Sequence, residues 1–442
     1  MSTSMSTTAA PRGSEHDVAV RDRADVLRQI KALVVLGIAA VLVAIFALSI
    51  DNPTVYWTLE RRATPDTRRT LDANVVAWSA FGYLVAALAL AAFNLLRKGW
   101  VSGLVFVGAG LAFYVGFLMW FFADQRELGG IGAISIVNPL PQTVLYATPL
   151  VLGAMAGVLC ERAGVINIAI EGQFLMGAFF ASVASSAAYS AEAGLLGGAL
   201  AGVAVASLLA WFAIRFQIDQ IVLGVVLIAL CLGLTNFLLG QIPTARENPA
   251  LASYLNQPLT LDTIRIPGLA DIPVLGPALF EQSLLAYLMY ASVALVAFLL
   301  FQTRWGLRVR AVGEHPKAAD TVGINVNRRR WSAVLLGGVF AGLGGAFFTV
   351  GSTGAFDQNP SNGQGFIALA AVIMGRWHPV GATVAAVFFG FMLATRDQLS
   401  VLTKIDSELL SAAPYLATVI AVAGFVGRVR PPAADGQPYG KA

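Results

Sequence analysis

The chain has 442 residues, of which 57% are hydrophobic and 12% charged, with a mean hydropathy of +0.72 and a formal net charge of +4. A water-soluble protein of this length cannot hide so many apolar side chains, because much of a folded surface has to be polar. The composition therefore excludes an ordinary soluble protein and predicts a membrane protein. The small basic excess is then a topology signal, and no nucleic-acid partner is expected.

The apolar residues fall in continuous runs, which predict spanning helices; barrel strands would be shorter and would alternate apolar with polar residues. The predicted fold class is all-α, a polytopic transmembrane helical bundle with about 12 crossings. The run at 366–375 has only ten residues, so a broken or half helix is expected there. The expected spans are 30–50, 75–96, 101–122, 140–159, 166–188, 194–214, 220–240, 283–301, 331–350, 366–375, 380–395 and 409–426.

Basic residues predict the orientation of the chain. The loop 303–330 carries seven Arg and Lys residues against two acidic ones, so we expect it to be cytoplasmic. The segment 241–282 contains six prolines, which excludes a regular spanning helix and predicts a folded loop on the outer side. The expected regions are a cytoplasmic tail at 1–29, a three-span extension at 30–137, a helical core at 138–428 and a second cytoplasmic tail at 429–442.

Several small residues are expected to serve packing alone. Cys160 and Cys231 lie in or beside apolar runs and are interpreted as small buried side chains, without a disulfide. Small residues four apart let helix backbones approach closely in lipid, so we interpret two such sets as helix contacts. These sets are Gly108, Ala112 and Gly116, and Gly338, Gly342 and Ala346.

The most informative segment is Gly313-Glu-His-Pro-Lys-Ala-Ala-Asp-Thr-Val-Gly-Ile324. Pro316 suits the first turn of a short helix, and Gly323 is placed to end it. Such a helix between basic flanks could dock into a groove on a partner protein, or the segment could be a solvated loop whose arginines only set topology.

This segment resembles the EAA-type cytoplasmic loop of ABC importer permeases, in the version Gly-Glu-Asn-x-x-Ala-Ala-x-x-x-Gly-Ile of the branched-chain amino acid and sugar group. His315 departs from that pattern, which has Asn. In that family the loop is a coupling helix that receives the motion of the ATPase. The resemblance implies a coupling role for Gly313, Glu314, His315, Lys317, Ala318, Ala319, Asp320 and Gly323.

Two further stretches agree with this resemblance. Residues 161–172, Glu-Arg-Ala-Gly-Val-Ile-Asn-Ile-Ala-Ile-Glu-Gly, are similar to a signature of nucleoside and simple-sugar permeases. Residues 363–381, which begin Gly-Gln-Gly-Phe-Ile-Ala-Leu-Ala and contain Gly-Arg-Trp-His-Pro, resemble the late signature of the same permeases. The resemblance covers about residues 138–428, which implies an ABC permease core there, and it leaves the role of 1–137 open.

Some polar residues in apolar surroundings are candidates for the translocation pathway, because lipid penalises such groups. Asn167 and Glu171 are four apart and share a helix face. The alternative for Glu171 is an ion pair with Arg162 near the cytoplasmic end of its span. The further candidates, each with an ordinary structural alternative, are Asn236, Asn362 and Arg376.

No catalytic constellation is evident. The sequence has no Gly-x-x-x-x-Gly-Lys-[Ser/Thr] phosphate loop, and its three histidines lack metal-ligand spacing. We therefore expect neither an enzyme nor a bound metal or cofactor, and any ATP hydrolysis would occur on another chain.

The resemblance implies a multi-pass permease in a bacterial plasma membrane, with both termini cytoplasmic. The implied partners are a cytoplasmic ABC ATPase, a second paralogous permease that makes a heterodimer, an extracytoplasmic substrate-binding lipoprotein and the membrane lipid. The signatures look closest to nucleoside permeases. Alternatives are a simple-sugar (ribose-like) permease, a secondary transporter that uses Glu171 for ion coupling, and a membrane enzyme.

Overall fold

The structure is a computed structural model that describes residues 23–58, 69–96, 100–123, 133–135, 139–242, 254–352, 354–400 and 430–440. The chain divides into two compact units, Met1–Ile136 and Val137–Ala442, and we describe each by itself. The expected span at 409–426 and most of the N-terminal tail lie outside the described residues.

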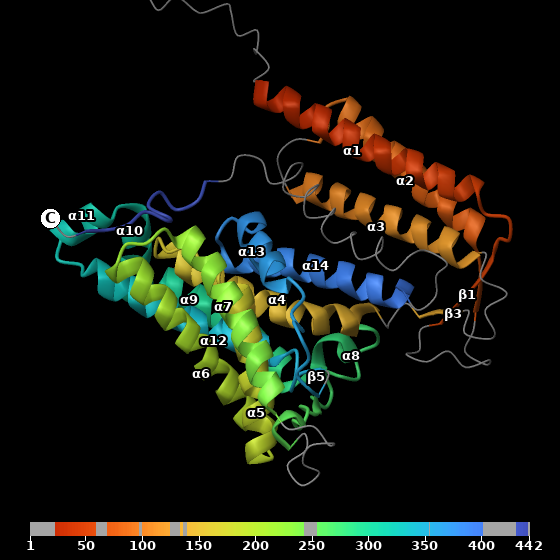
Figure 1. The fold of residues 1–442 in the computed structure, drawn as a ribbon. Helices are drawn as coiled ribbons and strands as arrows, with labels where there is room; N and C mark the ends of the chain where they lie inside the picture. Colours follow the sequence, from red (N-terminus) through yellow and green to blue (C-terminus); the bar gives the residue numbers. More distant parts are fainter. Residues whose placement is uncertain are drawn as a thin grey trace, which may run out of the picture. The chain divides into compact units, whose positions relative to one another are not determined.

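The N-terminal unit contains three long helices, α1 (Arg23–Leu48), α2 (Ala73–Ala92) and α3 (Trp100–Ala123), which pack against one another (Figure 1). A small sheet accompanies them, with strand order β2-β1-β3; β1 pairs with β2 antiparallel and with β3 parallel. Asp72 caps α2 by accepting the N–H groups of Asn74 and Val75. The strands are β1 (Thr54–Thr58), β2 (Arg69–Asp72) and β3 (Ala133–Ser135).

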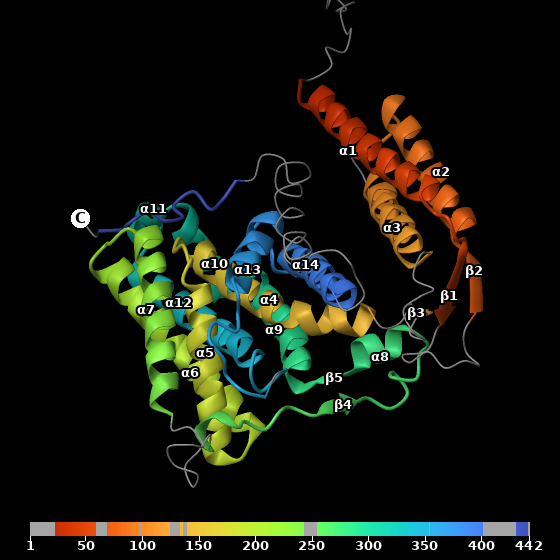
Figure 2. The ribbon, with the colours of Figure 1, turned by 45° about the vertical axis from the view of Figure 1, so that its right-hand side comes forward.

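The C-terminal unit is built around α4 (Pro139–Arg162), with 83% of its most apolar stretch buried within the chain. α9 (Leu284–Gln302), α12 (Val326–Ala346), α13 (Gln364–Met374) and α14 (Pro379–Ser400) pack around it (Figures 1 and 2). The remaining elements are α5 (Ile170–Ala188), α6 (Ala191–Ala210), the π-helix η3 (Trp211–Arg215), α7 (Gln220–Gln241), the 3₁₀ turn η4 (Tyr254–Asn256), β4 (Thr263–Arg265), α8 (Leu275–Phe280), β5 (Glu281–Ser283), α10 (Arg304–Glu314) and α11 (Pro316–Thr321).

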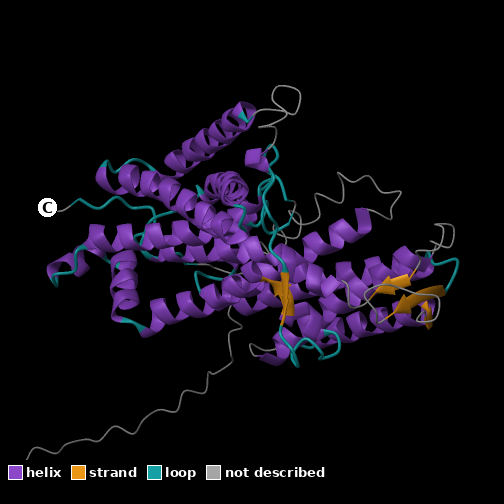
Figure 3. Cartoon of the chain, turned by 90° about the horizontal axis from the view of Figure 1, so that it is seen from below, coloured by secondary structure: helices purple, strands orange, loops and turns teal. Residues whose placement is uncertain are grey.

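The protein is mostly helical, as expected, and the strands of its described residues form two small sheets (Figure 3). Eight of the described helices are long and apolar enough to cross a membrane. α13 is an apolar helix of 11 residues, the short helix that its run predicts. These helices make the protein a multi-pass membrane protein.

Two expected elements differ from the structure. The span expected at 166–188 begins only at Ile170, because the preceding residues form turns and irregular backbone. The loop expected at 303–330 consists largely of two short helices, α10 and α11, followed by the first turns of α12. α10 was missed because its basic residues obscure an amphipathic helix, which buries Gly306, Val309 and Val312.

Small residues bring α6 and α12 into close contact. A β-carbon at Gly202 would overlap the Gly338 carbonyl oxygen, and one at Gly342 would overlap the Gly198 carbonyl oxygen. The interpretation of the Gly338 set as helix packing is therefore confirmed. Both cysteines are buried and free, as predicted.

Candidate functional site

The segment 313–324 forms a bend and a short helix that follow α9 and α10. The hydroxyl of Thr303 caps α10 by accepting the N–H of Gly306 at 3.1 Å. His315 is extended, with φ −141°, and separates α10 from α11, which begins with Pro316. Gly323 has φ +80°, a left-handed conformation that favours glycine, and it lies two residues beyond the end of α11. The expected short helix is thus present.

The predicted coupling residues divide between two faces of this segment. Val322, beside them, is 74% exposed, so the outward face has an apolar centre with charged neighbours. Of the predicted residues, Glu314, His315, Lys317, Ala318 and Gly323 are exposed, Asp320 is half-buried, and Gly313 and Ala319 are buried.

Gly313 is the contact between α10 and the end of α4. A β-carbon at Gly313 would overlap the carbonyl oxygen of Arg162, so only glycine fits at this approach. The Arg162 guanidinium lies 6.0 Å from the centre of the Phe301 ring, near the end of α9. α10 therefore packs directly against the end of α4.

The turn between α13 and α14 also contacts the end of α4. Arg162 Nε donates to the carbonyl oxygen of Trp377 at 2.8 Å, and Trp377 Nε1 donates to the carboxylate of Glu161. Trp377 and its neighbour Arg376 both have positive φ, 54° and 58°, a conformation that non-glycine residues adopt at a cost. The Trp377 contacts hold this tight turn in place.

Glu171 lies at the N-terminus of α13. One of its carboxylate oxygens accepts the Ser361 hydroxyl at 2.6 Å and the Gly363 N–H at 2.9 Å, and the other accepts the Gly365 N–H at 2.7 Å. Helix N-termini leave N–H groups without partners and carry a partial positive charge, so a buried carboxylate fits there. The pairing of Glu171 with Arg162 is wrong, because Arg162 donates to Trp377 instead.

Asn167 does not join this contact, although it shares the same signature. Its side-chain nitrogen donates to Gln173 Oε1 at 3.1 Å and lies 3.6 Å from Cys160 Sγ. Both amides are fully buried, and Asn167 Oδ1 and Gln173 Nε2 have no hydrogen-bond partner.

Of the other predicted pathway residues, Asn362 lies beside Glu171, between Ser361 and Gly363, which both bind its carboxylate. Asn236 is half-buried on α7, with a buried side-chain oxygen that lacks a partner. Asn362 is exposed beside Gly363, and Arg376 is exposed at the far end of α13. The structure therefore brings Asn362 next to Glu171, but it does not join Asn167, Asn236 and Arg376 to that contact by any hydrogen bond among the described residues.

Sequence reasoning missed the partners of these groups. Ser361, Gly363 and Gly365 bind Glu171, and Trp377 binds Glu161, across sequence separations of 190 to 216 residues. A signal was present, because Gly-x-Gly directly before an apolar run indicates a helix start that something approaches closely. A β-carbon at Gly365 would indeed overlap the backbone of Glu171.

Near the C-terminal end of α5, two serines bind η4 and the residues that follow it. Ser182 donates to Asn256 Oδ1 at 2.7 Å, and Asn256 also binds both backbone groups of Phe356, at 2.8 and 3.0 Å. The N–H of Leu259 donates to the Ser185 hydroxyl at 3.1 Å. These bonds join three segments that are far apart in sequence.

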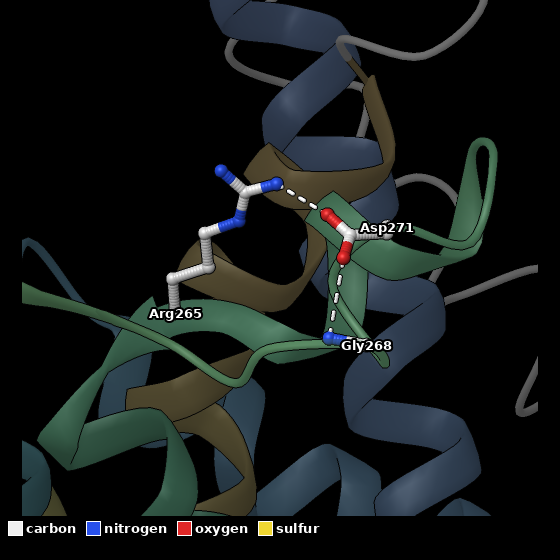
Figure 4. Close-up of polar contacts among 3 residues, drawn as sticks. All are labelled: Arg265, Gly268 and Asp271. Atoms are coloured by element: carbon white, nitrogen blue, oxygen red, sulfur yellow. Dashed lines mark hydrogen bonds and ion pairs between the residues drawn. The ribbon is translucent and has the colours of Figure 1, made fainter.

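The remainder of this loop carries an exposed polar contact, drawn in Figure 4. The guanidinium of Arg265 on β4 pairs with the carboxylate of Asp271, which also accepts the N–H of Gly268 at 3.2 Å. Both charged side chains are 61% exposed, so this pair contributes little stability. It shapes a turn on the surface of the loop.

Among the described residues, no group of His, Cys, Asp and Glu side chains could hold a metal ion. The buried carboxylates of Glu161 and Glu171 are bound by hydrogen-bond donors of the protein itself. Of its three conspicuous segments, 161–172 contacts both 313–324 and 363–381 directly.

Comparison with known proteins accounts for this convergence. The family model for the permease component of the branched-chain amino acid transport system matches residues 140–426. The chain belongs to this permease family. No solved structure matches it.

The chain is 40% identical over 311 residues to the guanosine ABC transporter permease protein NupQ of Bacillus subtilis, across 68% of this chain and 95% of that protein. It is 38% identical to the nucleoside ABC transporter permease protein NupC of Lactococcus lactis, across 70% of this chain and all of that protein. A second guanosine permease protein of Bacillus subtilis, NupP, is 24% identical, across 61% of this chain and 76% of that protein. These relatives are transport proteins, and no catalytic activity is indicated.

Proposed function

We propose that this chain is the permease subunit of an ATP-driven importer of nucleosides, in which a separate ATPase supplies the energy. Two relatives that it covers almost completely, at 38 and 40% identity, are named as permeases for nucleosides and for guanosine. These names favour nucleosides over ribose-like sugars. The transport assay described below identifies which nucleosides are carried.

The observation that carries this proposal is that the end of α4 contacts both the segment 313–324 and the turn after α13. The exposed face of α11 is a docking surface for the ATPase, and Gly313 presses α10 against Arg162. From Arg162 and Glu161, hydrogen bonds lead to Trp377 at the end of the half helix α13. A displacement of α10 and α11 is therefore passed to α4 and to α13.

In this mechanism Glu171 is a positioning residue. Its carboxylate holds the N-terminus of α13, a half helix whose movement would open or close the pathway. The buried amides Asn167 and Gln173, Asn236, Asn362 and Arg376 are proposed to lie along or beside that pathway. A carboxylate already bound by three donors is poorly suited to ion coupling, which disfavours a secondary transporter.

The proposed orientation places α10 and α11 in the cytoplasm, because residues 303–330 are rich in arginine and such loops are cytoplasmic. With about 12 crossings, of which α13 is the half helix, both termini are cytoplasmic and the protein lies in a bacterial plasma membrane. The loop 254–283 then faces outward, where a substrate-binding lipoprotein would dock. A second permease completes the membrane core, as the two guanosine permeases of one bacterium suggest.

The test is uptake of radiolabelled nucleosides by cells that express the whole system, with the ATPase either intact or inactive in hydrolysis. We expect uptake only with the intact ATPase, and competition by unlabelled nucleosides but not by ribose. Uptake that continues unchanged with the inactive ATPase would sink the proposal. Uptake of ribose alone would overturn the assignment of nucleosides as the substrate, but not the assignment to ATP-driven importers.

A further inference from the structure

The residues at 430–440 fold onto the same end of the C-terminal unit as α10 and α11, where Figure 1 marks the C-terminus. The sequence predicts only a cytoplasmic tail here. In the structure this C-terminal segment (430–440) makes hydrogen bonds to three separate parts of the unit and packs against a fourth, α11.

The first contacts hold the end of α10. The N–H of Ala434 donates to the Gly313 carbonyl oxygen at 2.9 Å, and the N–H of Ala433 donates to the Glu314 carboxylate at 3.2 Å. The last carbonyl groups of a helix have no partners inside it, so such donors stabilise its end. The carbonyl of Ala434 also lies against Gly164, where a β-carbon would be only 2.9 Å from its oxygen.

The second contacts join α12 and the start of α7. Arg330 is 1% exposed, and its guanidinium donates to the Gln437 carbonyl oxygen at 2.9 Å. Gln217, between η3 and α7, donates to the Tyr439 carbonyl oxygen at 3.1 Å. A buried guanidinium needs acceptors, so the C-terminal segment supplies part of what keeps Arg330 in place.

Tyr439 is the contact to α11 itself. Its ring is 8% exposed and packs in one cluster with Val312 of α10, Ala319 of α11 and Val326 of α12. Burial, and after it the neighbouring carboxylate of Asp320, raise the pKa of its hydroxyl. Ala319 is the buried residue of α11, and the ring of Tyr439 therefore fills the space beneath this helix.

We propose that the C-terminal segment, through Tyr439, holds α11 in the position in which it binds the cytoplasmic ATPase. A six-residue helix is too short to be stable alone, so its position depends on the surface beneath it. Loss of the Tyr439 ring leaves that surface open and lets α11 move. This inference rests on the proposed docking of an ATPase on α11.

The experiment compares Tyr439→Ala, Tyr439→Phe and the control Pro438→Ala in the full chain, purified with its partner permease in lipid nanodiscs. Pro438 is the exposed neighbour of Tyr439 in the same segment. Hydrogen exchange reports the local opening of α11, and titration with the purified ATPase subunit reports its affinity. Neither readout needs nucleoside uptake.

We expect Tyr439→Ala to speed exchange of the α11 amides by at least about tenfold and to weaken ATPase binding by a similar factor. Tyr439→Phe keeps the ring and should change both readouts by less than about threefold, and Pro438→Ala should leave both unchanged. A global loss of protection in Tyr439→Ala would indicate misfolding; Tyr439→Leu, which keeps part of the apolar volume, then replaces it, and both readouts should change by more than about threefold.

Unchanged exchange in Tyr439→Ala would overturn the role of Tyr439. Faster exchange with unchanged ATPase affinity would overturn the link to docking, while nucleoside uptake by the wild type would stand. Conversely, the proposed function fails on its own if the wild type binds the ATPase tightly yet carries no nucleoside.

Discussion

The N-terminal unit buries small apolar residues between its helices, whereas the C-terminal unit buries charged groups and amides. On α1, Leu36, Ala40 and Val43 face the other helices, while Ile38 and Val41 are 57 and 60% exposed. In the C-terminal unit Glu171, Gln173 and Arg330 are at most 4% exposed. A polar group inside a membrane protein is costly unless it is hydrogen-bonded. Such groups therefore occur where they bind one another or where function requires them.

Buried polar groups and the family match are found in the same unit. Among the described residues of the N-terminal unit, Thr58 is the buried polar residue, and it lies on a strand. The family match also begins at residue 140, within the other unit. The following predictions test the contrast, beginning with the largest expected effect.

The largest effect is expected for Glu171→Ala, which leaves the Ser361 hydroxyl and two N–H groups without an acceptor. A hydrogen bond to a charged group is worth about 1.5–3 kcal/mol, so α13 should lose at least about 3 kcal/mol of local stability. Nucleoside uptake should fall by about 100-fold, measured in cells at matched expression.

The matched variant for this prediction is Glu171→Gln. It keeps one acceptor oxygen and should retain more uptake than Glu171→Ala. If both variants transport like the wild type, the position of α13 does not depend on this carboxylate. If Glu171→Gln is as inactive as Glu171→Ala, the charge itself is required, and ion coupling returns as an explanation.

Two glycine substitutions should have effects of opposite sign. Gly365→Ala places a β-carbon on the backbone of Glu171 and should destabilise the protein by about 1–3 kcal/mol. Gly110→Ala in α3 meets no atom within 4 Å and should stabilise its helix by up to about 1 kcal/mol. Thermal unfolding in nanodiscs measures both, and a stabilising Gly365→Ala would contradict the close approach of α13 to α5.

Elements whose signal lies in their own residues could be predicted from the sequence. Hydrophobic runs predicted most of the described long helices to within a few residues, because each run carries its own signal. The short helix that begins at Pro316 was predicted from local turn chemistry, since Pro and Gly act on their own backbone.

The partners of Glu171 and Glu161 could not be predicted, because they lie 190 or more residues away along the chain. The family resemblance singled out the segments 161–172, 313–324 and 363–381, but it did not predict which residues they contact. The short strands and the C-terminal segment were missed for the same reason. Their residues are held by distant backbone groups, as Ala434 is by Gly313, and nothing in their own composition predicts this.

A pH-dependent effect is expected at Asp435. Burial raises the pKa of this carboxyl to about 7, although Arg330 opposes the shift, and Glu161 of α4 lies near enough to interact with it. The usual pKa is about 3.9, so between these values the docked segment binds more protons than the undocked one. Docking of 430–440 should therefore weaken as the pH rises towards about 7 and stay constant above it.

A spin label at Pro438→Cys measures this docking, because label mobility does not itself titrate. Mobility should rise between pH 5 and 7 and should lose that dependence in Asp435→Asn. A dependence that survives in Asp435→Asn would belong to Glu161 instead. Mobility that falls as the pH rises would contradict the direction of the shift.

The smallest effect is expected for Asp271→Ala, in the loop of Figure 4. Asp271, like Glu171, binds more than one donor: the guanidinium of Arg265 and the N–H of Gly268. It is 61% exposed, so water replaces its bonds, and such a pair is worth about 0.2–1 kcal/mol. Thermal unfolding should hardly change, and Arg265→Ala should match it. A loss comparable to that of Glu171→Ala would show that burial is not what separates these two carboxylates, and the contrast between polar groups inside the helices and those in the loop would then need another cause.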